Sequence, residues 1–274
     1  MAVPEVMTTQ VEPLHYAIDK IVSADTGLAA YHCISREEVL GLSIPPSKWL
    51  VVDDKALFMI YRNKRILPLG DPESIARALR NDQFRAEIAD RFTYVTRMDE
   101  GYTLGVDWYN VLNSRPVDRM VLSAGDFIPT IYSQDSMEIV PLLPEHKPDI
   151  ERVLTDYPNN AFRDHRLKSG LYRGLVIDGE LASLAGIHGV SLTNKVAVIG
   201  DVVTKKGMRG KGYGPICISA VADELFKLGI NLIAVNIFSD NSASISSHRK
   251  VGFRQHCQLL EIDCEKRSPR KPNQ

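Results

Sequence analysis

The sequence predicts an α/β (α+β) protein in which helices cover the faces of a mixed sheet. Its 274 residues are 44% apolar and 24% charged, which is ordinary for a globular protein with a full core. Strand-like and helix-like segments in the second half follow the order β-α-α-β-β-β-α-β-α-β, and this alternation favours a mixed sheet flanked by helices. The first half combines β-rich runs with an amphipathic helical pattern, so it is also expected to fold.

In the first half, Asp53-Asp54-Lys55 separates two β-rich runs and predicts a hairpin. Asp71-Pro72 supplies a helix cap followed by proline at the first helical position. Apolar residues four apart then predict one helix over 72–91, or two helices broken at Asn81-Asp82. The strands expected in this half are 49–52, 56–61, 65–69, 93–97, 117–123 and 127–132.

The second half gives clearer periodic patterns. The turn Asp178-Gly179-Glu180 predicts an antiparallel hairpin between its flanking strands. The strands expected here are 137–142, 171–177, 181–188, 196–204 and 231–238, with a last strand pair over 253–263. The helices expected are 145–166, interrupted near Pro158, then 213–228 and 242–251. We therefore expect an N-terminal α/β region of unknown role (1–135), a second domain (136–265) and a basic, unstructured tail (266–274).

Charge and cysteine usage narrow the classes of function. The formal net charge is −1, so bulk electrostatics would not attract the protein to nucleic acid or to an anionic membrane. The four cysteines lack C-x-x-C spacing, which predicts reduced, mostly buried thiols and no metal site. Residues 1–12 lack the features of a secretory signal, and the apolar stretch 230–238 is too short to cross a bilayer. A cytoplasmic location is expected.

Chemistry is concentrated in the segment from Val202 to Gly214, where a strand runs through a glycine-rich turn into a helix. Glycines at 210, 212 and 214 permit left-handed backbone and close approach of a ligand. The unpaired N–H groups of a helix that starts near Tyr213 would attract an anion such as a pyrophosphate. A Walker loop is excluded because Gly212 follows Lys211, and the dinucleotide fingerprint fails at its third glycine. Glycines alone would fit an ordinary turn.

Two motifs extend this interpretation. Arg209-x-x-Gly212-x-Gly214, after a strand ending in Val-Val-Thr, resembles the R/Q-x-x-G-x-G/A signature of the Gcn5-related N-acetyltransferases (GNAT). The block Asn241-x-x-Ser244-Ile245-x-x-His248-x-Lys250-x-Gly252-Phe253 is similar to a second element of that family. The two motifs are separated by a helix and a strand, as in the family. The resemblance implies a mostly antiparallel GNAT sheet, and it does not reach residues before about 135.

The resemblance also implies an activity and a set of roles. It implies acetyl-CoA as co-substrate and direct acetyl transfer to a primary amine of a small molecule or peptide. The thioester would lie in a gap between two splayed strands, flanked by 202–204 and 236–238. The residues that the resemblance places at the cofactor are Val202, Val203 and Thr204 for pantetheine, Arg209, Gly210, Lys211, Gly212, Tyr213 and Gly214 for the pyrophosphate, and Asn241 and Ser244.

The sequence departs from the family in its catalytic positions. His248 stands where the family has the tyrosine that protonates the departing thiolate, and it could be either that acid or a structural helix histidine. Asn236 and Val198 stand where family members have a glutamate base. Asp201 is the nearest carboxylate, with a structural or substrate-orienting role as its alternative.

Several alternatives stay open. The domain could be a non-catalytic acyl-CoA-binding sensor or scaffold, or an enzyme that modifies an antibiotic or toxin. Residues 1–135 could be a degenerate copy of the same fold or a cap over the acceptor pocket. They contain no R-x-x-G-x-G, so one CoA site per chain is expected. The acceptor, the acyl chain and the choice between monomer and homodimer are not defined by the sequence.

Overall fold

The computed structural model describes residues 19–35, 47–98, 109–130, 136–158 and 160–267. They fall into two compact units, each built from separate pieces of the chain. Unit 1 takes in 1–25, 45–117 and 257–274, and unit 2 takes in 26–44 and 118–256. These units do not follow the boundaries at 135 and 265 expected from sequence, because pieces of the N-terminal region belong to unit 2 and the last strand extends into unit 1.

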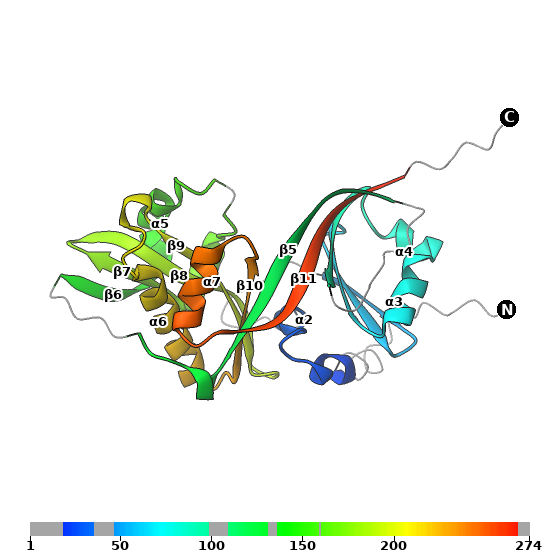
Figure 1. Ribbon diagram of the computed structural model, residues 1–274, viewed down its shortest axis with the longest axis horizontal. Helices are drawn as coiled ribbons and strands as arrows, with labels where there is room; N and C mark the ends of the chain where they lie inside the picture. The colour runs from blue at the N-terminus through cyan, green and yellow to red at the C-terminus, as the bar shows by residue number, and fades with distance from the viewer. Residues whose placement is uncertain (1–18, 36–46, 99–108, 131–135, 159, 268–274) are drawn as a thin grey trace. The chain divides into compact units, whose positions relative to one another are not determined.

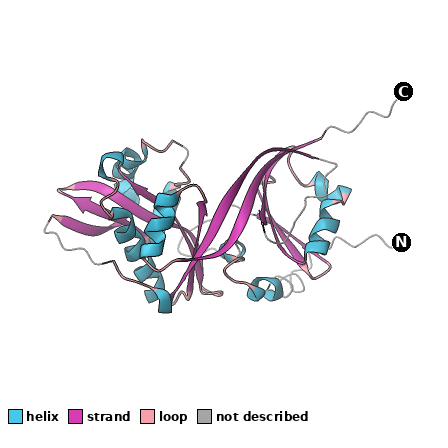
Figure 2. Cartoon of the chain, in the orientation of Figure 1, coloured by secondary structure: helices cyan, strands magenta, loops and turns pink. Residues whose placement is uncertain are grey.

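Unit 1 is a sheet with helices packed beside it. The strands β1 (Ser47–Val52), β2 (Ala56–Tyr61) and β3 (Arg65–Gly70) form an antiparallel meander. Asp53 and Asp54 turn with positive φ, which confirms the predicted hairpin. The expected break in the helix is also present, since α3 (Pro72–Leu79) and α4 (Asp82–Ala86) are separated at a capping Asn81 (Figure 2).

Unit 1 continues with β4 (Arg91–Arg97), which runs parallel to β3 after the α3–α4 crossover. On its other side β4 pairs antiparallel with β11 (Arg254–Lys266). The strand order in this unit is therefore β1-β2-β3-β4-β11. Its core contains Phe58, Phe84 and Tyr94, with Phe58 and Phe84 rings 4.6 Å apart.

Unit 2 contains the segment in which both motifs lie. Its sheet has the order β5-β10-β9-β8-β7-β6. Helices α5 and α6 contact its strands, and α7 packs beside α6 (Figure 1). The short helix α2 contacts β8 and β9. The bounds are β5 (Tyr109–Ser123, from Asp118 in this unit), β6 (Met137–Leu142), β7 (Tyr172–Ile177), β8 (Glu180–Ser191), β9 (Val196–Thr204), β10 (Leu232–Phe238), α2 (Ala30–Ile34), α5 (Lys147–Leu154), α6 (Tyr213–Lys227) and α7 (Ser242–Lys250).

Some expected elements differ from the structure. The expected strand 127–132 is absent over 127–130, and residues 131–132 lie outside the described part. The Ile128 amide donates to the Val251 carbonyl and the Thr130 amide to Ser219 Oγ, so neither joins a strand ladder, and Pro129 has no amide proton. The second half of the helix expected at 145–166 is the 3₁₀ segment Asp164–Ser169 (η3). The expected last strand pair is the single strand β11, which includes Lys266 of the expected tail.

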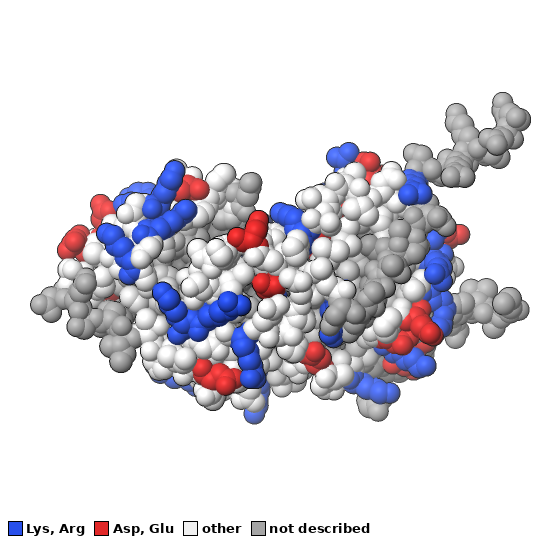
Figure 3. Space-filling view, in the orientation of Figure 1, with Lys and Arg blue, Asp and Glu red and all other residues white. Residues whose placement is uncertain are grey.

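The cysteines, the lengths of the helices and the surface charges are next considered for the described residues. All four cysteines are free, and three of them are buried, in agreement with the expected reduced thiols. No helix in the described ranges is both long enough and apolar enough to span a bilayer. Both signs of charge occur on each unit on the face drawn in Figure 3.

The parallel pair β9–β10 is short. Its register covers only Leu232↔Val196, Ile233↔Ala197 and Ala234↔Val198. Beyond these pairs β9 continues for six residues to Thr204, and β10 continues for four to Phe238. The two strands therefore part after three residues, as the family resemblance implies.

Two bulges in β8 and β9 lie beside this point. Between the pairs Leu184↔Val203 and Gly186↔Gly200, β9 contains one extra residue, and Asp201 has a left-handed φ of 52°. Between Ile187↔Ile199 and Gly189↔Val198, β8 contains one extra residue in turn, so the original register returns. The two bulges re-aim Asp201 and His188, which otherwise would follow the regular alternation of the strands.

Glycines leave room for the side chains near the bulges. Gly186 and Gly200 lie opposite each other on β8 and β9. A Cβ atom at Gly186 would overlap the Tyr172 ring, and one at Gly200 would overlap the His188 ring. Neither glycine has a positive φ, so the requirement is for space and not for backbone conformation.

We expect Gly186→Ala and Gly200→Ala each to lower the free energy of unfolding by about 1–3 kcal/mol, because the added methyl group overpacks a filled site. Urea unfolding of the purified variants measures this. Gly125→Ala is the matched control, since nothing lies within 4 Å of a Cβ built there and its φ is not positive. An unchanged stability for both core variants would contradict the account of the glycine pair.

Candidate functional site

The edge of β9 that faces away from β8 is open beyond Val198. The Lys205 amide bonds to Ala182 of the strand β8 (2.9 Å), and Ser183 Oγ donates to the Val203 carbonyl. Backbone groups alternate in direction along a strand, so those of Val202 and Thr204 point toward the gap between β9 and β10. The described geometry thus provides the unpaired backbone edge that the resemblance implies for pantetheine.

Part of this edge is occupied by a tyrosine that the sequence did not identify. The Tyr157 hydroxyl donates to the Thr204 carbonyl at 2.6 Å. Arg209 lies over the Tyr157 ring, with its guanidinium carbon 4.8 Å from the ring centroid and its Nε 2.8 Å from the hydroxyl. Tyr157 therefore links the end of β9 to the first residue of the glycine motif.

The glycine-rich turn leads directly into α6. Gly210 and Gly212 have φ of 80° and 83°, in the region that glycine alone adopts without strain, and nothing lies within 4 Å of a Cβ at either position. Gly212 is the N-cap of α6, and no side chain caps that helix. The amides of Tyr213 and Gly214 are thus available at the positive end of the helix, where they can bind an anion.

Three elements meet at Gly214. A Cβ there would lie 3.6 Å from Ser247 Oγ and 3.9 Å from Thr204 Oγ1, which are ordinary contacts. The end of β9, the start of α6 and the middle of α7 are therefore neighbours. The structure brings together the residues predicted for pantetheine and for the pyrophosphate.

Asn241 and Ser244 belong to the first turn of α7. The Asn241 side chain caps that helix by accepting the Ser244 amide at 3.1 Å. Ser244 also accepts from His248 through its carbonyl. The Asn241 side-chain oxygen is thus already used in capping the helix. The contacts of Asn241 and Ser244 with a cofactor stay a prediction.

His248 differs from the acid that the motif suggested. Its side chain is buried, and its Nδ1 lies 2.8 Å from the Ser244 carbonyl, which assigns the proton to Nδ1. Nε2 has no hydrogen-bond partner among the described residues. Burial lowers the pKa of His248 to about 4, although the bond to Ser244 acts in the opposite direction. The ring is therefore neutral at pH 7, and the expected imidazolium donor is not formed in this structure.

Asp201, the nearest carboxylate to the missing base, lies in a buried network. Its side chain is 1% exposed, and its Oδ2 accepts from the Tyr172 hydroxyl at 2.6 Å and from Arg166 at 3.2 Å. Burial alone would raise the pKa of Asp201, but His188, Tyr172 and Arg166 outweigh it and hold the pKa below its ordinary value. The carboxylate is therefore ionised, buried and bonded to Tyr172 and Arg166, which fits a structural or orienting role.

A second group of residues near the gap was missed by sequence analysis. The Tyr31 hydroxyl lies 3.1 Å from His188 Nδ1. Arg119 of β5 lies over the Tyr31 ring at 5.2 Å and donates to Asn236 of β10 and to the Gly27 carbonyl. Glycines inside β8 and β9 are the sequence signal that could have indicated irregular strands and a close approach here.

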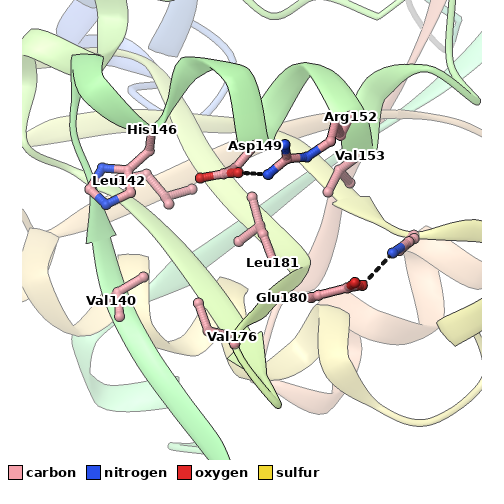
Figure 4. Close-up of a pocket in the computed structure, with 11 residues that line it drawn as sticks. Val140, Leu142, His146, Asp149, Arg152, Val153, Val176, Glu180 and Leu181 are labelled. Carbon is pink, nitrogen blue, oxygen red and sulfur yellow. Dashed lines mark hydrogen bonds and ion pairs between the residues drawn. The ribbon is translucent and has the colours of Figure 1, made fainter.

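A pocket of about 460 Å³ lies elsewhere in unit 2, between α5 and the strands β6, β7 and β8. Ion pairs Asp149–Arg152 and Glu180–Lys205 border its apolar floor (Figure 4). None of the predicted catalytic or cofactor residues lines it. It reaches the end of β9 through Lys205, which follows Thr204.

Unit 1 repeats part of this topology without the site. Three antiparallel strands lead into a helix and then into a parallel strand, and β3 and β4 pair only at Arg65↔Thr93 and Ile66↔Tyr94. Here α3 begins at Pro72 after the N-cap Asp71, whose carboxylate accepts the Ser74 amide at 2.8 Å. That bond lowers the pKa of Asp71. An ionised carboxylate thus occupies the position where an anionic ligand would bind.

The sequence comparisons agree with this geometry. Residues 136–253 match the profile described as the acetyltransferase (GNAT) family. No curated protein matches the chain in sequence. The C-terminal half is a GNAT domain, and membership in this family indicates acyltransferase activity.

Solved structures share the fold at low sequence identity. A Drosophila protein matches with a TM-score of 0.64 at 13% identity, over 95% of this chain and 98% of its own. A tandem GNAT protein from the clavulanic acid biosynthesis pathway matches with a TM-score of 0.60 at 11% identity, over 97% of this chain and 98% of its own. A GCN5-related N-acetyltransferase from Kribbella flavida matches with a TM-score of 0.59 at 14% identity, over 87% of this chain and 96% of its own. At these identities the likeness establishes the fold alone.

The neutral state of His248 predicts a loss of stability in acid. Because its pKa is about 4 in the folded state and 6.5 ordinarily, the unfolded chain takes up a proton between these values that the folded chain does not. Its contribution, roughly 3 kcal/mol, is present above pH 6.5 and is lost as the pH falls toward 4. Urea unfolding across this range should show a weaker pH dependence for His248→Asn than for the wild type.

His256→Asn is the matched control, because His256 is exposed, and it should keep the wild-type pH dependence. If His248→Asn also keeps the wild-type dependence, the histidine is charged in the folded protein and the assignment of a neutral ring is wrong.

Proposed function

We propose that the protein is an acetyl-CoA-dependent N-acetyltransferase acting on a primary amine of a small molecule or peptide. The observation that carries this proposal is the continuity of two open features. The edge of β9 at Val202 and Thr204, which no strand pairs, leads through left-handed Gly210 and Gly212 to the uncapped N-terminus of α6. A linear ligand with an amide-containing arm and a pyrophosphate at its end has the chemistry to fit both.

The pantetheine arm would lie along β9 as an added strand, with its amides bonded to Val202 and Thr204. The Thr204 carbonyl now accepts from Tyr157, so the tyrosine must release it when the arm binds there. The pyrophosphate would lie against the amides of Arg209 to Gly214 at the start of α6, where the helix dipole favours negative charge.

The acetyl thioester would then reach the gap between β9 and β10. An uncharged amine attacks the thioester carbonyl, and backbone N–H groups of β9 stabilise the oxygen that gains negative charge. The carbon–sulfur bond breaks and the CoA thiolate leaves. His248 is assigned no proton in this step, because its neutral ring donates only to Ser244; a proton from the nitrogen of the product or from water neutralises the thiolate.

Unit 1 takes no part in cofactor binding in this proposal. Its α3 carries Asp71 at the N-cap in place of a glycine-rich turn. The repeated topology supports its interpretation as a copy of the fold without a CoA site, and one acetyl-CoA per chain follows. The alternative function, a non-catalytic acyl-CoA sensor, predicts binding of acetyl-CoA without turnover by any amine.

We expect Gly214→Asp to weaken acetyl-CoA binding by tenfold or more, or about 1.4 kcal/mol, because the new carboxylate would lie at the pyrophosphate. An acidic residue in the first turn suits the helix dipole, and the position accepts a Cβ, so the fold should persist. Calorimetry measures affinity, and mass spectrometry of an amine panel incubated with acetyl-CoA measures transfer.

Gly125→Asp is the matched control, because it adds the same charge at an open glycine, and it should keep wild-type affinity and transfer. Unchanged affinity in Gly214→Asp would reject the site. Binding without acetylation of any amine in the panel would favour the sensor.

A further inference from the structure

A continuous row of polar side chains lies beside the point where β9 and β10 part. The Tyr31 hydroxyl is 3.1 Å from His188 Nδ1, and His188 Nε2 is 3.8 Å from Asp201 Oδ1. Asp201 is in turn held through its other oxygen by Tyr172 and Arg166. His188 Nε2 and Asp201 Oδ1 are both buried and have no hydrogen-bond partner among the described residues, so their contact is an ion pair at 3.8 Å and not a hydrogen bond. The two atoms therefore face each other.

Local irregularities of β8 and β9 build the row. A pair of compensating bulges brings His188 and Asp201 out of alternation toward one another. Gly200 and Gly186 leave the space for the His188 and Tyr172 rings. Buried polar groups destabilise a fold unless they are partnered, so a fold that retains this row at irregular strands has a use for it.

The partners define the state of the imidazole. Burial and the charge of Asp201 raise the pKa of Tyr172 well above its ordinary value, so Tyr172 stays a donor. The ionised Asp201 carboxylate lies beside Nε2 and favours the tautomer with the ring proton on Nε2 and the lone pair on Nδ1. The Tyr31 hydroxyl then donates to Nδ1. A buried aspartate that fixes one tautomer and stabilises the doubly protonated ring is the arrangement that makes histidine a base in acyl transfer.

The row ends at the gap. The His188 ring covers Gly200, two residues before Val202, and its side chain is 20% exposed while that of Asp201 is 1% exposed. The Tyr31 ring lies under Arg119, which bonds to Asn236 of β10. Tyr31 is thus connected to β8 through His188 and to β10 through Arg119, on both sides of the divergence.

We propose that His188 is the general base for the acceptor amine, that Asp201 positions it, and that the Tyr31 hydroxyl connects Nδ1 to the amine. The inference rests on the proposed acetyl transfer. An alkylammonium acceptor gives one proton to the Tyr31 oxygen while Tyr31 passes its own proton to Nδ1. The freed lone pair attacks the thioester carbonyl, the carbon–sulfur bond breaks, and a second nitrogen-bound proton neutralises the CoA thiolate. The imidazolium, held beside Asp201, then releases its proton to solvent.

The charged and titratable groups that face His188 come from several elements. They are Asp201 on β9, Tyr31 on α2, and, through these, Tyr172 on β7, Arg166 on η3 and Arg119 on β5. The two arginines lie behind Asp201 and Tyr31, so the nearest charge to the ring is negative.

The test compares an acceptor that must lose a proton with one that need not. Phenethylamine is charged at neutral pH and aniline is not. We expect His188→Gln to lower kcat/KM for phenethylamine by about 10²- to 10⁴-fold and to change that for aniline only a few-fold. Tyr31→Phe should lower the phenethylamine value less, because water can replace a hydroxyl. Asp201→Asn should also lower kcat/KM for phenethylamine more than for aniline, because the ring loses the carboxylate that positions it. Acetyl-CoA affinity should be unchanged in all three.

His256→Gln, at an exposed histidine outside the row, is the matched control and should behave as the wild type. Equal losses with both amines, or no loss in His188→Gln, would overturn the assignment while acetyl transfer itself stands. If the wild type acetylates neither amine nor any member of the wider panel, the proposed function fails instead. In that case ¹⁵N NMR of the His188 ring still decides the geometry, since a proton on Nδ1 in place of Nε2 would overturn the inference.

Discussion

The structure of unit 2 depends on the early end of pairing between β9 and β10. Parallel strands joined by a helix ordinarily continue side by side, but these part after Ala234↔Val198. The consequence is a row of unpaired backbone groups inside a folded domain, which is unfavourable unless a partner satisfies them. In the described structure Tyr157 satisfies one of them at Thr204, and we propose that acetyl-CoA satisfies them during the reaction. The helix that follows β9 supplies the second half of the same binding surface.

Glycine serves two different purposes around this divergence. At Gly210 and Gly212 it permits a left-handed backbone and leaves open space at the start of α6. At Gly186 and Gly200 the backbone is unstrained, and the missing side chain makes room for aromatic and imidazole rings. Unit 1 shares the strand–helix–strand topology and has a positive-φ glycine, Gly70, before its helix, but a Cβ there would overlap Lys55 and the Asp71 carboxylate occupies the helix N-terminus. The same arrangement of elements can therefore carry a site in one unit and none in the other.

Local patterns predicted the elements well, and distant contacts explain the failures. Strand β9 and the start of α6 lie where periodicity and glycine placed them, because these signals are local. The row at His188 escaped prediction because Tyr31 is 157 positions from it and the bulges shift the alternation. The motif located His248 correctly on its helix, but a motif does not report burial, which keeps that ring neutral. The boundary at residue 135 did not allow for strands that run from one unit into the other.

The central claim, one acetyl-CoA site along β9 and α6, is tested most directly by amide hydrogen exchange with and without acetyl-CoA. The account predicts slower exchange at Val202, Thr204 and Gly210 to Gly214 when acetyl-CoA is bound. It also predicts no change in the first turn of α3, where Asp71 already holds the Ser74 amide. Protection in α3 with none at the start of α6 would contradict the account.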